Sequence, residues 1–333
     1  DAWAMCSYKE GASAKMISEG RQAEWATHNT LHISRVYPKG SRVDSSNFNP
    51  CAFWDAGVQM TALNYQTFDL ALALNTAMFD ANGGCGYVLK PPFLRASNRP
   101  TQFDGSKGVV VGAAVNNPLP ALEMPRVLFR LQVQLVAAVY VPTPNDPFLE
   151  SHHADPLGHK CQSGSFMWWT PPAAALVEGE AKLCDPIVSC EVHGGLFAGA
   201  GQAAGGAAAG AGRASPAGSQ PLSHGSVWES EAVKSNGLNP QWEDAHFEII
   251  SSHPEISQAM FVVGYRTRPT EKLRQLALGA INLSCVRPGL RCFSLREPKH
   301  GLPLRFTKLL LRVSKDTLPL ESLHARPASR SSP

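Results

Sequence analysis

An arginine and a tyrosine two positions apart are the residues of this sequence best suited to chemistry. Arg35 and Tyr37 lie in a short β-rich run, 31–37, which ends at the turn 38–40. Side chains two residues apart on a strand point to the same side. A guanidinium binds phosphate through two parallel charge-assisted hydrogen bonds, and an aromatic face can hold a sugar ring. The pair therefore predicts a site for a phosphorylated ring, with an exposed arginine beside a packed tyrosine as the alternative.

Composition narrows the class of protein without naming a function. The chain has 333 residues, 44% of them hydrophobic, which is enough for two ordinary domains. Its formal net charge of +3 gives no indication of nucleic-acid binding. The eight cysteines form no C-x-x-C pair, which favours reduced thiols in the cytosol. No apolar run approaches the ~20 residues of a membrane span, so we expect a soluble or peripheral protein.

The elements that must position Arg35 and Tyr37 belong to a first segment, 1–95. Helix-like and strand-like stretches alternate there: 10–29 has helical character, and 31–37, 58–65 and 86–89 are strand-like. Strands that alternate with helices predict βα units and a parallel sheet. The segment holds too few units to close an eight-stranded barrel.

A connector rich in Asn, Pro, Gly and Ser, 96–126, separates this segment from a β-rich one, 127–316. Two insertions interrupt the second segment, at 147–183 and 198–219, and a tail follows at 317–333. The second insertion is almost only Ala, Gly and Ser, so we expect disorder there and in the tail. The strand signals predict an antiparallel β-sandwich; they lie at about 127–141, 185–193, 227–233, 242–251, 258–265, 275–283, 291–296 and 307–315.

Three strings of the first segment carry a family resemblance. S-R-V-Y-P-K-G-S-R-V-D-S-S-N at 34–47, F-W-D-A-G-V-Q-M-T-A-L-N-Y-Q-T at 53–67 and N-G-G-C-G-Y-V-L-K-P-P-F-L-R at 82–95 resemble the Y half of a eukaryotic phosphoinositide-specific phospholipase C. N-G-L-N-P-Q-W at 236–242 and R-P-G at 287–289 resemble the C2 domain that follows it. The resemblance implies α/β plus all-β architecture: the C-terminal half of a TIM-type (β/α)8 barrel, then a C2 antiparallel β-sandwich.

The resemblance also implies roles for three residues. The family's S-R-[IV]-Y-P motif places Arg35 on the 4-phosphate of the inositol headgroup and stacks Tyr37 on the inositol ring. An S-[FY]-x-E string, here Ser7 to Glu10, makes Ser7 a neutral donor to phosphate. The alternative for Ser7 is a helix N-cap with Glu10 three residues later. We assign the family's D-S-S-N string, 44–47, to loop structure.

The residues that would do the proton chemistry are not in this chain. In the family, two histidines act as general acid and base and a Ca²⁺ ion activates the inositol 2-hydroxyl. All of these lie in the preceding X half, so this chain alone lacks the catalytic histidines. We expect structural roles for His28 and His32. The remaining candidates have loose metal-like spacing but are interpreted as surface residues; they are His152, His153, His159 and Cys161.

The C2 resemblance implies a calcium site that this sequence fills poorly. Asp185 and Asn236 are the candidate metal ligands, and the site is expected to be weak or degenerate. The loop that should carry paired Asp residues is basic instead. It is interpreted either as a solvated basic loop or as a surface that meets anionic lipid; its cations are Arg266, Arg268, Lys272 and Arg274. Ser41 stands where many relatives carry Trp, so membrane insertion there should be weaker.

The resemblance thus implies part of a phospholipase C that hydrolyses phosphatidylinositol 4,5-bisphosphate to diacylglycerol and inositol 1,4,5-trisphosphate. This chain would supply headgroup binding and membrane docking. Its partners would be the phosphoinositide headgroup, an anionic membrane through C2 and the X half, but no nucleic acid; its location would be cytoplasmic and peripheral to membranes. The alternative is a catalytically inactive phosphoinositide-binding or scaffold protein.

Overall fold

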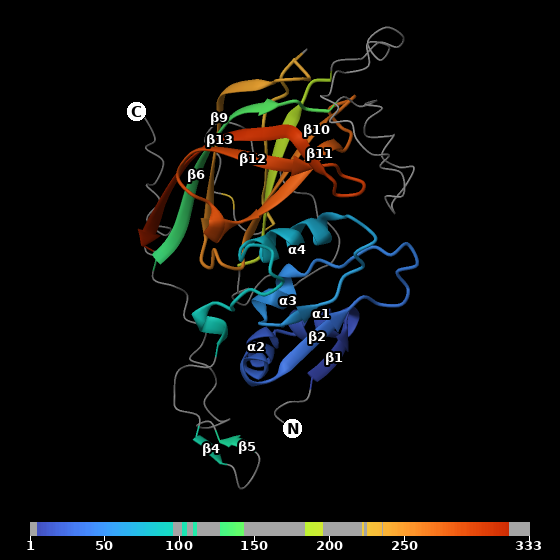
Figure 1. The fold of residues 1–333 in the computed structure, drawn as a ribbon, viewed down its shortest axis with the longest axis vertical. Helices are drawn as coiled ribbons and strands as arrows, with labels where there is room; N and C mark the ends of the chain where they lie inside the picture. Colours follow the sequence, from blue (N-terminus) through green and yellow to red (C-terminus); the bar gives the residue numbers. More distant parts are fainter. Residues whose placement is uncertain are drawn as a thin grey trace, which may run out of the picture.

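A short parallel sheet with helices lies next to a larger antiparallel sandwich (Figure 1). The computed structural model describes residues 5–95, 102–104, 109–111, 127–142, 184–195, 222, 225–234 and 236–319. The elements of the first part are β1 Met5–Lys9, α1 Glu10–Ser18, α2 Gln22–Leu31, β2 Ile33–Tyr37, α3 Cys51–Asp55, β3 Met60–Thr61, α4 Leu70–Asp80 and the 3₁₀ turn η1 Pro92–Leu94.

The first sheet confirms the predicted parallel βα pattern. Strands β1, β2 and β3 lie side by side in that order and are parallel. The predicted helix at 10–29 is divided in two by a turn at Gly20, whose φ of 76° favours glycine. The run 86–89, predicted to be strand-like, is irregular. Three parallel strands are described here, and the half-barrel stays a prediction.

The second part is a sandwich in which one hydrogen-bonded sheet folds over on itself. Its strand order is β8-β7-β10-β11-β12-β13-β6-β9. The link between β11 and β12 is a single register pair, Leu278 with Arg296, so the sheet bends there into two layers. The strands are β6 Val127–Val139, β7 Ile187–His193, β8 Val227–Glu229, β9 Gln241–Ser251, β10 Gln258–Tyr265, β11 Arg274–Asn282, β12 Gly289–Arg296 and β13 Pro303–Pro319, with a 3₁₀ turn η4 at Leu283–Cys285.

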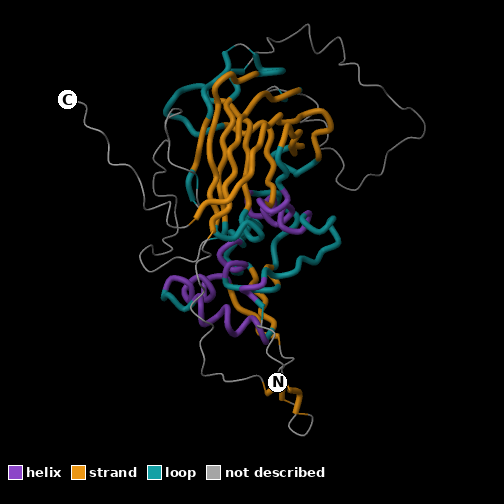
Figure 2. Tube along the Cα trace, turned by 90° about the vertical axis from the view of Figure 1, so that its left-hand side faces the viewer, coloured by secondary structure: helices purple, strands orange, loops and turns teal. Residues whose placement is uncertain are grey.

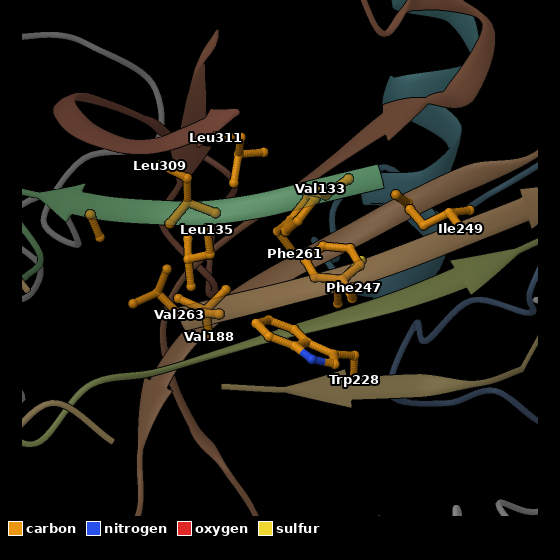
Figure 3. Packing of buried hydrophobic residues seen from close by; sticks show 14 of the residues in the cluster. Val133, Leu135, Val188, Trp228, Phe247, Ile249, Phe261, Val263, Leu309 and Leu311 are labelled. Carbon is orange, nitrogen blue, oxygen red and sulfur yellow. The ribbon is translucent and has the colours of Figure 1, made fainter. Parts of the chain in front are cut away.

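Apolar side chains from both layers meet between them, as alternation along the strands predicted. Figure 3 shows the Trp228, Phe247 and Phe261 rings between the layers, beside Leu309 and Leu311. The ring centroids of Trp228 and Phe247 are 4.5 Å apart. All eight predicted strands are present; the bounds of 258–265 are as predicted, and those of the others differ by at most four residues at either end.

The connector and the insertions are described only in part. The connector contains a two-stranded antiparallel pair, β4 Gln102–Asp104 with β5 Val109–Val111, which the sequence did not indicate. The insertion 147–183 and the insertion 198–219 lie outside the described residues. Strand β13 continues to Pro319, so regular structure extends three residues into the segment expected to be a tail.

The two parts share a buried interface, in which α4 lies on the outer face of β10 and β11 (Figures 1 and 2). Leu74 and Met78 of α4 pack with Met260 and Leu278 of the sandwich. Polar groups are buried here too: the Cys51 thiol donates to Gln258 Oε1 at 3.2 Å, and Gly195 N–H donates to Asp55 Oδ1 at 3.0 Å. Among the described residues, no helix has the length and apolarity needed to span a membrane.

Candidate functional site

The exposed face of the small sheet brings together the three residues predicted to bind a headgroup. Arg35 and Tyr37 lie on β2, and the Arg35 guanidinium carbon is 5.3 Å from the centroid of the Tyr37 ring. Ser7 is the register partner of Arg35 across the parallel β1–β2 pair. Partners in register project to the same face of a sheet. Ser7, Arg35 and Tyr37 therefore share one face, as a single binding site requires.

The alternative role for Ser7 as a helix cap is wrong. Ser7 lies inside β1, and the N-cap position of α1 is Lys9, whose side chain makes no capping hydrogen bond. Lys9 is itself exposed and is the register partner of Tyr37. A second cation thus joins the site, one that the sequence did not single out because its strand pairing was unknown.

The rest of this face is apolar and open within the described part of the chain. Met5 is 49% exposed, Ile33 43% and Met60 45%. Met60 on β3 is the register partner of Arg35. Large apolar side chains exposed on a sheet face are unusual unless another surface covers them. The face therefore combines cations, a hydroxyl, an aromatic ring and uncovered apolar groups.

The opposite face of the sheet is packed against the helices and fixes the strands. Val36 is fully buried between Arg35 and Tyr37. Tyr8 of β1 lies edge-on to Trp25 of α2, with ring centroids 5.6 Å apart, and Trp25 contacts Phe53 in the same way at 6.2 Å. Because neighbours along a strand alternate between faces, this packing directs Arg35 and Tyr37 outward.

A buried ion pair orders the loop that follows Tyr37. Glu10 has a relative exposure of 7%, and both of its oxygens accept from the guanidinium of Arg42, at 2.8 and 2.9 Å. The same carboxylate accepts from Lys39 N–H at 3.2 Å. The Arg42 side chain is partly exposed, but its loss would leave the buried Glu10 carboxylate without its ion-pair partner, which destabilises the loop. Glu10 and Arg42 are 32 positions apart, and neither composition nor local spacing indicates the pair.

The D-S-S-N string is structural, as predicted. The Asp44 carboxylate accepts from the backbone N–H of Ser46 at 3.2 Å and from its hydroxyl at 2.9 Å. Asn47 Nδ2 donates to three acceptors, Asn64 O, Thr67 O and Asp69 Oδ1, and its Oδ1 accepts from Asn64 N–H at 2.6 Å. Asn47 thus ties the loop after β2 to the N-terminal end of α4.

The imidazole rings of the two histidines in the first segment stack on each other. The ring centroids of His28 and His32 are 4.5 Å apart. Burial, with a smaller contribution from the neighbouring His32, lowers the pKa of His28. Both lie where α2 meets the start of β2, and Gln59 Nε2 donates to His32 O at 2.8 Å. This placement agrees with the structural roles expected for them.

The loop end of the sandwich does not offer a calcium site that the described residues could fill. Asn236 Oδ1 accepts from Asn239 N–H at 3.2 Å, so this oxygen closes a turn. Asp185 is exposed. Within the described ranges, no three His, Cys, Asp or Glu side chains come together as a metal site would require. The donor set is too small for the six to eight oxygens that Ca²⁺ takes.

Two of the four cations of the basic loop form ion pairs with carboxylates of the protein. The Arg266 side chain is 13% exposed, and it donates to Glu229 Oε1 at 2.6 Å and to Glu271 O at 2.9 Å. Arg274 lies 3.7 Å from Glu271 Oε2. Arg268 and Lys272 are exposed. Arg266 is therefore not available to a membrane, contrary to the interpretation of the loop as a lipid-binding surface. The cluster His152, His153, His159 and Cys161 lies outside the described residues.

Comparison with known proteins points to one family. Residues 1–93 match the family described as Phosphatidylinositol-specific phospholipase C, Y domain. The 1-phosphatidylinositol 4,5-bisphosphate phosphodiesterase beta-1 of Bos taurus is 43% identical over 113 residues, which cover 34% of this chain and 9% of that protein. The beta-4 phosphodiesterase of Homo sapiens is 57% identical over 76 residues, covering 23% of this chain and 6% of that protein.

A solved structure extends the similarity beyond the first segment. The crystal structure of L. pealei PLC21 superposes on 94% of this chain with a TM-score of 0.58, at 20% sequence identity, and 30% of that chain is covered. At this identity the likeness shows the fold alone. The chain therefore spans under a tenth of the length of these two curated relatives and about a third of PLC21. Over its first 93 residues, the chain is therefore similar to the Y domain of phosphatidylinositol-specific phospholipase C.

Proposed function

We propose that this chain supplies headgroup recognition and membrane docking to a phosphoinositide phospholipase C. The reaction would be hydrolysis of phosphatidylinositol 4,5-bisphosphate to diacylglycerol and inositol 1,4,5-trisphosphate, at a membrane and in the cytoplasm. The observation that carries the proposal is the shared face of Ser7, Arg35 and Tyr37 on two parallel strands. A guanidinium, a hydroxyl and an aromatic ring on one face match a phosphorylated inositol.

The arrangement suits recognition of a phosphate on a ring. Arg35 makes no hydrogen bond or ion pair with the described residues, so its fork of donors is available to a phosphate. Ser7 would donate a neutral hydrogen bond beside it, and Lys9 would add a second positive charge next to Tyr37. These groups bind and orient a headgroup. The general acid, the general base and the Ca²⁺ ligands would come from an X half outside this chain.

The open face of β1, β2 and β3 supports a TIM-type barrel that is completed by such an X half. In a barrel of this kind the helices cover the outside of the strands and the inner face is filled. Here the helices cover the face of Tyr8 and Val36, while Met5, Ile33 and Met60 are uncovered. The same interpretation makes the sandwich the C2 domain. Among the described residues, the candidate ligands Asp185 and Asn236 are not joined by the further oxygen donors that Ca²⁺ needs, so we propose that the domain docks without calcium.

Arg35→Ala in the complete protein should lower turnover of phosphatidylinositol 4,5-bisphosphate about a hundredfold, with little effect on unphosphorylated phosphatidylinositol. The expected factor corresponds to ~3 kcal/mol for two charge-assisted hydrogen bonds. The assay measures release of water-soluble inositol phosphates from mixed vesicles. Equal losses on both lipids would contradict the phosphate role of Arg35. Binding without release by the wild type would favour the alternative, an inactive phosphoinositide-binding scaffold.

A further inference from the structure

The outer face of the layer β12-β13-β6-β9 carries an alternating row of apolar and cationic side chains. Thr307, Leu309 and Leu311 of β13 point into the core and are buried. The residues between them point outward, since neighbours on a strand alternate between faces. We call this row the β13 stripe; it consists of Phe306, Lys308, Leu310 and Arg312.

Neighbouring strands widen the β13 stripe with more apolar surface. Leu290 of β12 is the register partner of Arg312 and is 54% exposed. Phe306 is 60% exposed, and its ring lies 5.9 Å from that of Tyr140, which is 50% exposed. Lys308 Nζ donates to the hydroxyl of Ser294 at 2.8 Å. The result is an aromatic pair at one end of the stripe and two cations along it.

The exposure of Tyr140 comes with backbone strain. Its φ is 51°, which is uncommon for any residue except glycine and an outlier for a bulky one. Two hydrogen bonds hold this conformation: Tyr140 N–H donates to Asn239 Oδ1 at 3.1 Å, and the buried Thr307 hydroxyl donates to Tyr140 O at 2.7 Å. Strain that is maintained by its surroundings and presents an aromatic ring to solvent suggests a function for the ring.

The positive charges of the β13 stripe are not neutralised by ion pairs in the described part of the chain. The carboxylates of Glu248 and Asp316 lie further along the face and are held by Arg130, and the exposed carboxylate of Asp244 on β9 lies 3.4 Å from Nε2 of His246. Neither Lys308 nor Arg312 has a carboxylate partner in the described part of the chain. The first segment does not cover this face, because α4 packs against the other layer, on β10 and β11.

We propose that the β13 stripe with Tyr140 and Leu290 docks on an anionic phospholipid membrane. Cations attract the negative surface of such a membrane, and aromatic rings settle at its headgroup level. A broad sheet face on which cationic and apolar side chains alternate matches an extended surface, such as a membrane, better than it matches a single small ligand. The inference rests on the proposed function, since the substrate would lie in that membrane. It moves the docking surface away from the basic loop 266–274, where Arg266 is engaged with Glu229.

The test is co-sedimentation of the 333-residue chain with vesicles of phosphatidylcholine, with or without phosphatidylserine. The double variant Lys308→Glu, Arg312→Glu should weaken binding to phosphatidylserine vesicles on the order of thirtyfold or more. The matched control Arg268→Glu, Lys272→Glu makes the same charge change on the exposed basic loop and should have a much smaller effect. A larger loss in the control than in the stripe variant would overturn the proposal, as would no phosphatidylserine-dependent binding by the wild type.

Tyr140→Gly separates docking from stability. Glycine accepts the positive φ at Tyr140 without strain, so the variant should unfold at the same or a higher temperature while it binds vesicles more weakly. Unchanged vesicle binding would remove the role of the aromatic pair. If the charge-reversal variant Lys308→Glu, Arg312→Glu fails to fold, the milder variant Lys308→Gln, Arg312→Gln takes its place. It should also bind phosphatidylserine vesicles more weakly than the wild type does.

The outcomes also separate this inference from the proposed function. If the stripe variants bind vesicles weakly and Arg35→Ala keeps its phosphate selectivity, the docking surface is supported and the headgroup site is contradicted. Normal vesicle binding by the stripe variants, with phosphate selectivity lost in Arg35→Ala, would support the headgroup site and contradict the docking surface.

Discussion

The free energy of unfolding of the wild-type chain should fall as the pH rises from about 4 to about 8, and Asp55→Asn should remove most of this fall. Asp55 is fully buried between the two parts of the chain, and burial raises the pKa of its carboxyl to about 8, although Gly195 N–H donates to it. In the unfolded chain this carboxyl loses its proton near its ordinary pKa of 3.8. Between the two values the folded state holds a proton that the unfolded state has lost, so the free energy of unfolding falls with rising pH.

Asparagine keeps the oxygen that accepts from Gly195 N–H and has no proton to lose. The variant should therefore have a flatter pH profile, with a gain over the wild type near pH 8 on the order of a few kcal/mol. Urea unfolding at several pH values measures this difference. Asp44→Asn is the matched control: Asp44 is exposed, and hydrogen bonds from Ser46 lower its pKa, so its contribution is lost only at acidic pH. Parallel profiles for wild type and Asp55→Asn would contradict the buried, protonated carboxyl.

Gly194→Ala should destabilise the chain by several kcal/mol through a clash with backbone. Gly194 has a φ of 76°, and a Cβ at this position would lie 2.3 Å from the carbonyl oxygen of Ile256. A backbone oxygen cannot rotate away as a side chain can, so the segment around Ile256, which packs at the interface, must shift. Thermal unfolding of the purified chain measures the loss.

Gly225→Ala isolates the cost of the backbone conformation alone. Gly225 has nearly the same φ, 75°, but within the described part of the chain no heavy atom lies closer than 4 Å to where the added methyl carbon would be. Alanine there should cost roughly 1–2 kcal/mol from the left-handed conformation. Equal losses in the two variants would show that φ, and not the close approach to Ile256, accounts for Gly194.

The sandwich could be predicted from sequence because its strands alternate. Strand β13 places Leu309, Leu311 and Val313 in the core, and the residues that alternate with them, among them Lys308, Arg312 and Ser314, lie on the other face. Helix α4 was not predicted, because the string Leu70–Asp80 is buried on most sides and shows no polar face. Its position on the outer face of β10 and β11 depends on contacts between distant parts of the chain, which local sequence does not show.

The site was predictable only in its local part. Arg35 and Tyr37 are two residues apart on one strand, so their shared face followed from strand geometry and is confirmed. The place of Ser7 beside Arg35 depends on the parallel register of β1 and β2, which local sequence does not determine. The pairing of Glu10 with Arg42, and of Arg266 with Glu229, also depends on long-range contacts. Because of the second pairing, the interpretation of Arg266 as a lipid-facing cation is wrong.

Binding of inositol 1,4,5-trisphosphate to the complete protein tests the central claim most directly, because it does not depend on turnover. Calorimetric titration should show that Arg35→Lys, which keeps the charge but loses the planar fork, weakens binding about tenfold. The exposed Lys15→Ala, on helix α1 away from the sheet face, should bind as the wild type does. Unchanged affinity in Arg35→Lys and in Arg35→Ala would contradict headgroup recognition by this face of the sheet.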